Sequence, residues 1–538
     1  MPQSLRDSLA EYPRIMLEAI AEGWGIVLTD EQTPEIVERL AAEMVHPESV
    51  QFVLRRLEQV ELEALAYVAA VGQVKAHVMA RKYGAIRRLG PGRLEWEAAW
   101  RQPISPAERL WFLGLICREY AKEERYHGEV FYVPAELRAS LPPLSIQLPS
   151  FRIRPAASPP VVHDDGDDLA HDVFVVLSYV RSHEVRARTP RSRRRRENVG
   201  YAANGILTVR ELAALCPRLA GSPDPQEPSP LARDAERGVR TRGAYPQEGV
   251  RRSSTYTQRL HFLLHLCQSA RLIAVKEEQW APTAEAAAWL KSGDIARRRV
   301  LYQAWLEDAG WNELWRMPGI HCEDTGWRND PLLPRQVVTD YLRQCAVGAW
   351  LTMQSFVDSL HEVAPDLMRP DGDYDSWYIR DTRTGQYLMG WGSWDKVEGA
   401  LIHYLLRYPL RWLGVVAIGQ AGGEVDASSF QLTQRGAAVL GSGGLVESQP
   451  QHMRVQADLQ VVVPPGVSWY DRFLLERFAR WVGEKDGLAR YHLDGELVRA
   501  YLAGGVTIER IRAFLRRVTG NRLPPEVTHA LQSWARTM

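Results

Sequence analysis

Residues 457–466 read ADLQVVVPPG, an apolar run that ends at two prolines and a glycine. This pattern predicts a buried strand with a sharp stop. A helix is expected next, with Ser468 as its N-cap. Its apolar residues recur at helical spacing: Phe473, Leu474, Phe478, Trp481 and Val482. Asp486-Gly487 predicts a turn into a second strand, LARYHLD, and three short helices follow up to residue 535. Residues 451–538 are therefore predicted to form a small α/β module.

The end of this module, GGVTIERIRAFLRRVTGNRLPPEVTHALQSWA (residues 504–535), resembles the N-terminal domain of XPB-type helicases, also called a helicase-associated domain. It is similar as well to the clutch module of the TFIIH subunit that holds XPB. The resemblance is carried by mostly apolar and turn residues: Gly505, Thr507, Ile508, Ile511, Leu515, Leu523, Pro524, Val527, Leu531 and Trp534. The resemblance implies an accessory fold and a helicase-related partner, and it says little about chemistry.

The rest of the chain predicts a mainly α protein with small β hairpins, an α+β fold of tandem winged-helix-like domains before the C-terminal module. Helices followed by a terminal hairpin give this expectation. The stretch from Tyr83 to Arg118 also resembles the body of bacterial helicase-associated-domain proteins. The predicted domains are 1–140, helical with a winged-helix-like part; 141–167, a Pro-rich linker; 168–295 and 296–450, two further winged-helix-like units; and 451–538. Residues 187–204 and 221–254 are expected to be disordered inserts.

Bulk properties exclude several classes of protein. Lys+Arg and Asp+Glu are equal at 66 each, so net charge indicates no partner. The five cysteines are far apart and form no CxxC pair, which argues against a disulfide framework or a structural zinc site. The N-terminus lacks the apolar core of a signal peptide, and no apolar run approaches the ~20 residues that cross a bilayer. We expect a cytoplasmic protein without a membrane partner.

Motifs of catalysis are missing from the sequence. It contains no GxxxxGK[ST] phosphate loop, no DExH strand end and no GxSxG elbow. The helicase motor is therefore absent, and we expect no enzyme activity, no catalytic residue and no cofactor.

Two groups of residues could bind a metal ion. HDDGDDLAHD, at residues 163–172, contains two histidines and five aspartates, enough hard ligands for Mg²⁺ or Mn²⁺. The alternative is a solvated linker in which Asp167 or Asp168 caps the next helix, and we prefer it. His261 and His265 are four apart but lack the glutamate of HExxH, so a buried helix face is expected there. We predict no metal site.

The distribution of arginine is the sequence feature that indicates a binding function. Residues 181–259 contain 17 arginines, no lysine and 8 acidic residues, an excess of nine positive charges. A nucleic-acid backbone is one partner for such a segment, and a solvated charge run is the alternative. The candidate nucleic-acid-binding residues are Arg191, Arg193, Arg194, Arg195 and Arg196 in this segment, and Arg81, Lys82, Arg87, Arg88 and Arg93 beside the GPGR turn.

A third group lies on one predicted helix of the C-terminal module: Arg510, Arg512, Arg516 and Arg517. A helix turns 100° per residue, so the four cannot share one face, and a protein-binding surface suits them better than a groove-reading one.

The sequence thus predicts a non-enzymatic DNA-binding accessory protein, associated with a helicase or with a DNA repair or transcription complex. The alternative is a protein-interaction scaffold without direct nucleic-acid binding. A third, less favoured hypothesis is a metal-dependent nuclease built on residues 163–172.

Overall fold

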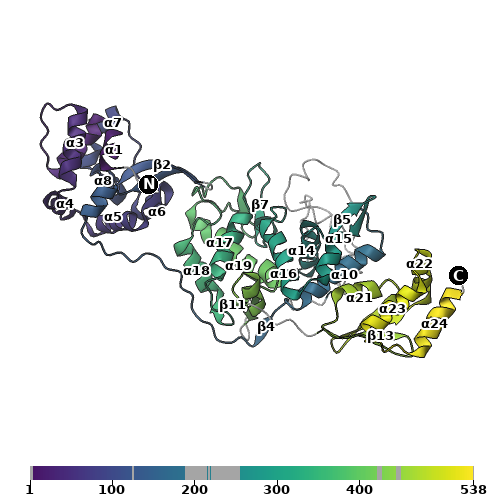
Figure 1. Cartoon of the computed structure of the whole chain (residues 1–538). Helices are drawn as coiled ribbons and strands as arrows, with labels where there is room; N and C mark the ends of the chain where they lie inside the picture. The colour runs from purple at the N-terminus through teal and green to yellow at the C-terminus, as the bar shows by residue number, and fades with distance from the viewer. Residues whose placement is uncertain are drawn as a thin grey trace. The chain divides into compact units, whose positions relative to one another are not determined.

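The computed structural model describes residues 4–123, 126–187, 255–420, 427–443 and 450–536, together with Leu215 and Leu219. The chain divides into two compact units (Figure 1). Unit 1 comprises Met1–Phe151 and Glu362–Ser376, and unit 2 comprises Arg152–His361 and Trp377–Met538. Both units are mainly helical with small antiparallel sheets, which confirms the predicted α+β class.

Unit 1 is a helical body with one small sheet. Its helices are α1 (Leu5–Ala10), α2 (Arg14–Trp24), α3 (Thr33–Met44), α4 (Pro47–Leu54), α5 (Gln59–Val71), α6 (Ala76–Tyr83), α7 (Pro91–Glu97), α8 (Pro106–Phe112) and α9 (Ala135–Ser140). Capping boxes at Gln32 and Glu58 begin α3 and α5 by satisfying free backbone amides at each N-terminus. Leucine, isoleucine and valine side chains from nearly every helix form one core, which includes Leu17, Leu40 and Leu65.

The sheet of unit 1 belongs to an order of helices and strands that recurs in unit 2. Its strands are β1 (Gln73–Lys75), β2 (Cys117–Glu123) and β3 (Tyr126–Tyr132). The order along the chain is helix α5, strand β1, helix α6, helix α8 and the hairpin β2–β3, with α7 between the last two helices. The first strand pairs with the last strand of the hairpin, so the sheet order is β1-β3-β2.

Unit 2 contains the same order once in full and once in part, because in the partial copy nearly all residues between the extended segment and the last helix lie outside the described part of the chain. The partial copy has α10 (Asp168–Ser182), an extended segment at residues 185–187 with an isolated β-bridge at Arg186, α14 (Thr255–Ser269) and the hairpin β5 (Ile273–Lys276)–β6 (Gln279–Pro282). Residues 185–187 pair with β6, the last strand of the hairpin.

The second copy has α17 (Leu332–Leu342), β8 (Trp350–Thr352), α18 (Met353–Val363), a continuous helix and the hairpin β10 (Val416–Gln420)–β11 (Ala427–Leu432). The continuous helix consists of α19 (Ala400–Leu405) between two π-type segments, η6 (Asp395–Gly399) and η7 (Leu406–Leu410). The strand β8 again pairs with the last hairpin strand, β11.

Other helices and strands of unit 2 join these two copies. They are β4 (Val161–His163), α15 (Ala284–Lys291), α16 (Asp294–Glu307), β7 (Ile320–Cys322), β9 (Ile379–Asp381) and α20 (Gln434–Val439). The helix α16 packs against both α14 and α20, and β4 extends the second sheet to the order β4-β10-β11-β8. The predicted boundary at 295/296 therefore does not separate two packed bodies.

The segment expected to be a linker is partly ordered. Backbone bonds join Ala156 N to Trp350 O and Thr352 N to Arg154 O, and β4 pairs with β10. Prolines favour extended backbone, and an extended backbone here adds to a sheet edge instead of remaining free.

The C-terminal module occupies the last part of unit 2 (Figure 1). Its strands are β12 (Arg454–Val455), β13 (Gln460–Val463), β14 (Ala479–Lys485) and β15 (Leu488–Leu493), in the order β12-β13-β15-β14. Its helices are α21 (Trp469–Leu475), α22 (Gly495–Ala503), α23 (Ile508–Val518) and α24 (Pro525–Arg536). Val461, Tyr491, Ile511, Leu515 and Leu531 belong to its core, so the buried strand and the final helices lie where the sequence predicted.

One local prediction in this module is wrong. The helix from Ser468 ends at Leu475, and Trp481 and Val482 lie on β14 with exposed side chains. The Asp486-Gly487 turn, with both residues at positive φ, joins β14 to β15 as a hairpin. Cross-strand pairing therefore outweighs the helical spacing of the apolar residues.

Candidate nucleic-acid and partner surfaces

Arg87 is tied to a buried carboxylate. Its Nε and Nη2 donate to Glu108 at 2.8 Å each, and its backbone N donates to the same carboxylate at 3.0 Å. The Glu108 side chain is fully buried at the start of α8, where Ile104 N also donates to it. Burial raises the pKa of Glu108, but the hydrogen bonds from Arg87 and the backbone outweigh it and lower the pKa. Arg87 is the counter-ion of this carboxylate and has little freedom to bind a phosphate.

The other predicted cations of unit 1 also have partners. Arg81 Nη1 donates to Asp366 at 3.0 Å, and Lys82 Nζ lies 4.5 Å from the ring centre of Tyr67. Arg88 bonds Glu129 at 3.1 Å, and Arg93 bonds Glu97 at 2.5 Å. Arg88 and Arg93 are 78% and 68% exposed, and such surface pairs open easily. The structure thus divides the predicted patch into exposed and engaged members.

Most of the helix that directly precedes each hairpin is buried; in the third copy Asp395 and Lys396, at the start of the helix, are exposed. We call these three helices the pre-hairpin helices; they are α8, α14 and the helix 395–410. Every side chain of α8 is buried or half-buried, as is every side chain at 258–269 and at 397–413. Phe262 of α14 packs on Trp311 and Trp412, with ring centres 5.1 and 5.3 Å apart. A helix that reads a DNA groove must expose side chains to base edges, so residues 106–112, 258–269 and 397–413 do not present a reading surface.

Trp96 is a candidate that the sequence did not single out. All eighteen tryptophans lie in the described part of the chain, and only Trp96 and Trp481 have exposed side chains. Trp96 is 85% exposed on α7, one turn after Arg93. Exposed tryptophan is common among the anchor residues of protein interfaces. Its position two residues after the apolar Leu94 was the available signal, because residues two apart in a helix face nearly opposite sides.

Four of the five aspartates of residues 163–172 pair with arginines. Arg435 bonds both Asp164 and Asp167, and Arg259 bonds Asp172. Asp165 lies 3.2 Å from Arg411 and 3.7 Å from Arg259. Burial, together with the charge of Asp172, raises the pKa of Asp168 to about 6. Four of the five carboxylates are therefore paired with arginines within the protein, and among the described residues no group of His, Cys, Asp and Glu could hold a metal ion. The geometry favours a structural role over the nuclease hypothesis.

The other metal candidate is also a packed helix face. His265 is buried on α14 and lies 3.1 Å from Asp308 Oδ2, while burial lowers the pKa of His261 to about 4. The two histidines have no acidic residue between them and share no ligand set.

The arginines of α23 differ in environment. Arg517 donates to both oxygens of Asp471 at 2.6 and 2.9 Å, which fixes α23 to α21. Arg510 and Arg516 are exposed, and Arg512 is half-buried. Two members therefore remain accessible to a partner.

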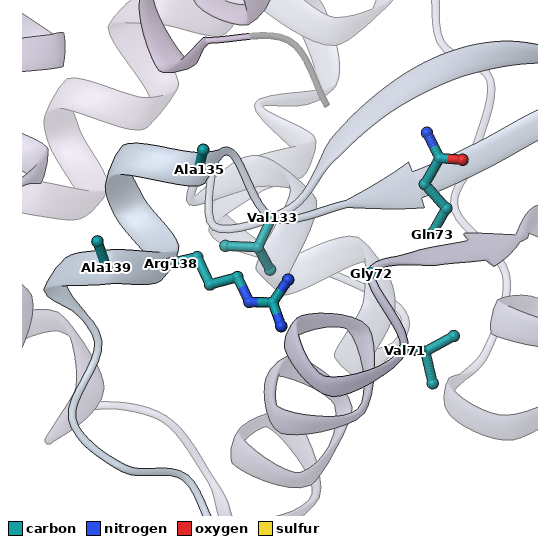
Figure 2. A pocket seen from close by; sticks show the side chains of 7 residues that line it. All are labelled: Val71, Gly72, Gln73, Val133, Ala135, Arg138 and Ala139. Carbon is teal, nitrogen blue, oxygen red and sulfur yellow. The ribbon is translucent and has the colours of Figure 1, made fainter. Parts of the chain in front are cut away.

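A pocket of about 670 Å³ lies between the end of α5, the start of β1 and α9 (Figure 2). Arg138 is the charged residue among those that line it, and Figure 2 shows its side chain extending from α9 toward the end of α5. Val71, Gly72 and Val133 supply apolar walls and backbone. This lining contains no acid–base pair and suggests no reaction.

Part of the predicted surface is outside the described residues, namely Arg191, Arg193, Arg194, Arg195 and Arg196. In the described part of the chain, no helix is both long and apolar enough to cross a membrane. The chain matches no protein-family model and no curated protein.

Proposed function

We propose that this protein is a non-enzymatic scaffold, which binds another protein through winged-helix-like repeats and does not read a DNA groove. The observation that carries the proposal is the burial of residues 106–112, 258–269 and 397–410, which make up most of the three pre-hairpin helices. The winged-helix interpretation is supported by the segments that pair with the last hairpin strand, namely the strands β1 and β8 and the isolated bridge at Arg186.

The exposed surface supports a protein partner. Trp96 extends from unit 1 at 85% exposure, and the apolar side chains of Val27 and Ile104 are 76% and 61% exposed. Tryptophan in particular is enriched among the residues that dominate the binding energy of protein interfaces. The resemblance of the C-terminal module to XPB-type helicase domains makes a helicase our proposed partner, with Arg510 and Arg516 as accessible contacts.

A second candidate function is sequence-independent binding of a nucleic-acid backbone. It rests on the arginine-rich residues 181–259 and their excess of nine positive charges. Of the three described arginines in that range, Arg181 contacts Phe473 O and Glu476, Arg259 is buried against Asp172, and Arg186 is exposed. The remaining charge must therefore come mostly from residues 188–252.

Selection from a random duplex library tests the scaffold proposal. We expect no enriched sequence, because the described side chains of the pre-hairpin helices are buried or half-buried apart from Asp395 and Lys396. A reproducible consensus site would overturn it.

Sedimentation with a purified XPB-type helicase tests the partner. A complex that weakens when Arg510 and Arg516 are changed to Ser is expected. Failure of the full chain to co-sediment would remove the helicase from the proposal.

A further inference from the structure

Residues 362–376 form an acidic segment of unit 1. The segment reads EVAPDLMRPDGDYDS and contains five acidic residues against one arginine. Its charge contrasts with that of VKAHVMARK at residues 74–82, which form β1 and most of α6. We call Lys75, His77, Arg81 and Lys82 the α6 surface.

Asp366 is the centre of the contact between the segment and the α6 surface. His77 Nε2 lies 2.9 Å from Asp366 Oδ2, and Arg81 Nη1 lies 3.0 Å from Oδ1. The Tyr374 hydroxyl donates to Oδ1 at 2.8 Å. The side chains of His77, Arg81 and Asp366 are only 17%, 18% and 13% exposed, so the segment removes them from solvent.

Two further contacts extend the cover. Lys75 Nζ donates to Pro370 O at 3.1 Å. Gly372 lies so close to His77 that a Cβ on it would be 2.3 Å from His77 Cγ, and its φ is +74°. The segment therefore follows the α6 surface closely from Asp366 to Gly372.

We propose that the α6 surface binds the phosphate backbone of a nucleic acid and that residues 362–376 cover it as an acidic mimic. A carboxylate that accepts from Arg and His uses the same donors as a phosphate oxygen. The cations also continue beyond the cover. Arg88 bonds Glu129, whose neighbour Val130 is the register partner of Lys75. A polyanion that displaced the segment would thus meet a row of cations, which one carboxylate does not fill. This inference goes beyond the scaffold function and does not depend on it.

Two variants open the cover by different means. Asp366→Asn removes the central charge. Gly372→Ala forces the segment away from His77 without any change in net charge. Matched controls are Asp358→Asn, an exposed acid on α18, and Gly385→Ala, at a φ of +72° with open space around it.

The assay is fluorescence anisotropy of a 20-base-pair DNA duplex at several salt concentrations, with the full chain. We expect both opening variants to bind at least fivefold more tightly than wild type at low salt. The slope of log K against log salt should steepen by ~0.9 for each added phosphate contact. Adding Arg81→Ser should remove the gain, and the controls should match wild type.

Folded opening variants without a gain in affinity would overturn the proposal. So would a gain that survives Arg81→Ser or that the controls share. Poly-glutamate that binds the opened variants as tightly as DNA would assign the surface to an acidic protein instead.

Hydrogen exchange on the wild-type chain covers the case in which the variants do not fold. When the wild-type chain is saturated with the DNA duplex at low salt, amide exchange should become faster at residues 362–376 and slower at residues 75–82. Unchanged exchange at both segments under saturation would also overturn the proposal.

Discussion

His77 and Asp366 lie 289 positions apart in the sequence, yet His77 Nε2 is 2.9 Å from Asp366 Oδ2. Burial raises the pKa of Asp366, but the hydrogen bonds from His77 and Arg81 outweigh it and lower the pKa to about 2. The stability that this contact of the acidic segment contributes to unit 1 therefore depends on pH.

The first prediction follows from the sign of this shift. A carboxyl whose folded pKa is lowered adds stability above its unfolded pKa, near 3.8, and loses it as the pH falls to about 2. Between pH 5 and 2, the wild type should lose about 2 kcal/mol more unfolding free energy than Asp366→Asn. Urea unfolding at a series of pH values measures the difference. Parallel pH profiles would contradict the assignment.

A second prediction concerns Arg87. Changing it to Ser leaves the buried Glu108 carboxylate without its counter-ion, which should cost about 3–5 kcal/mol of unfolding free energy. The matched control is Arg88→Ser, because Arg88 is 78% exposed and its loss should change stability by no more than ~0.5 kcal/mol. Denaturant unfolding compares the two. Equal stability of both variants would show that the Arg87–Glu108 pair is not structural.

A third prediction concerns the C-terminal module. A fragment of residues 451–538 should fold alone and unfold cooperatively, because its sheet and helices enclose their own core. Leu515 is fully buried there, so Leu515→Ala should cost about 2–5 kcal/mol. Circular dichroism during thermal unfolding measures both. A fragment without secondary structure would mean that the module depends on α10 and α15, against which α21 packs.

A fourth prediction concerns ATP. The sequence contains no phosphate loop, so purified protein should hydrolyse ATP no faster than a mock preparation, with or without DNA. Release of inorganic phosphate measures the rate. Turnover that co-purifies with the chain through successive columns would contradict the absence of a motor.

The last prediction separates the two candidate functions. Changing Arg191, Arg193, Arg194, Arg195 and Arg196 to Ser should weaken DNA binding equally for all sequences if these residues contact phosphates. The slope of log K against log salt should flatten by up to ~0.9 for each lost contact. Anisotropy titrations measure both quantities. Equal affinity of variant and wild type at low salt would leave the scaffold function without this second activity.

Local patterns in the sequence were sufficient for the fold class and for much of the C-terminal module. The buried strand at 460–463 and the helices α22, α23 and α24 follow from apolar periodicity and from turn residues such as Pro464 and Gly505. These signals act over a few residues, so they are readable without knowledge of the tertiary structure. The same signals misplaced Trp481, because pairing of β14 with β15 decided its conformation.

Only the tertiary structure decided what the candidate residues do. The sequence does not show whether a cationic side chain is exposed to solvent or paired with a carboxylate. Arg81 pairs with the carboxylate of Asp366, which is 285 positions away. Burial of the pre-hairpin helices likewise depends on α16, α17 and the N-terminal helices, which the helices' own sequences do not encode. Ion pairing and burial are decided by groups brought together across the fold, and so a sequence alone shows which charges exist but not which remain free.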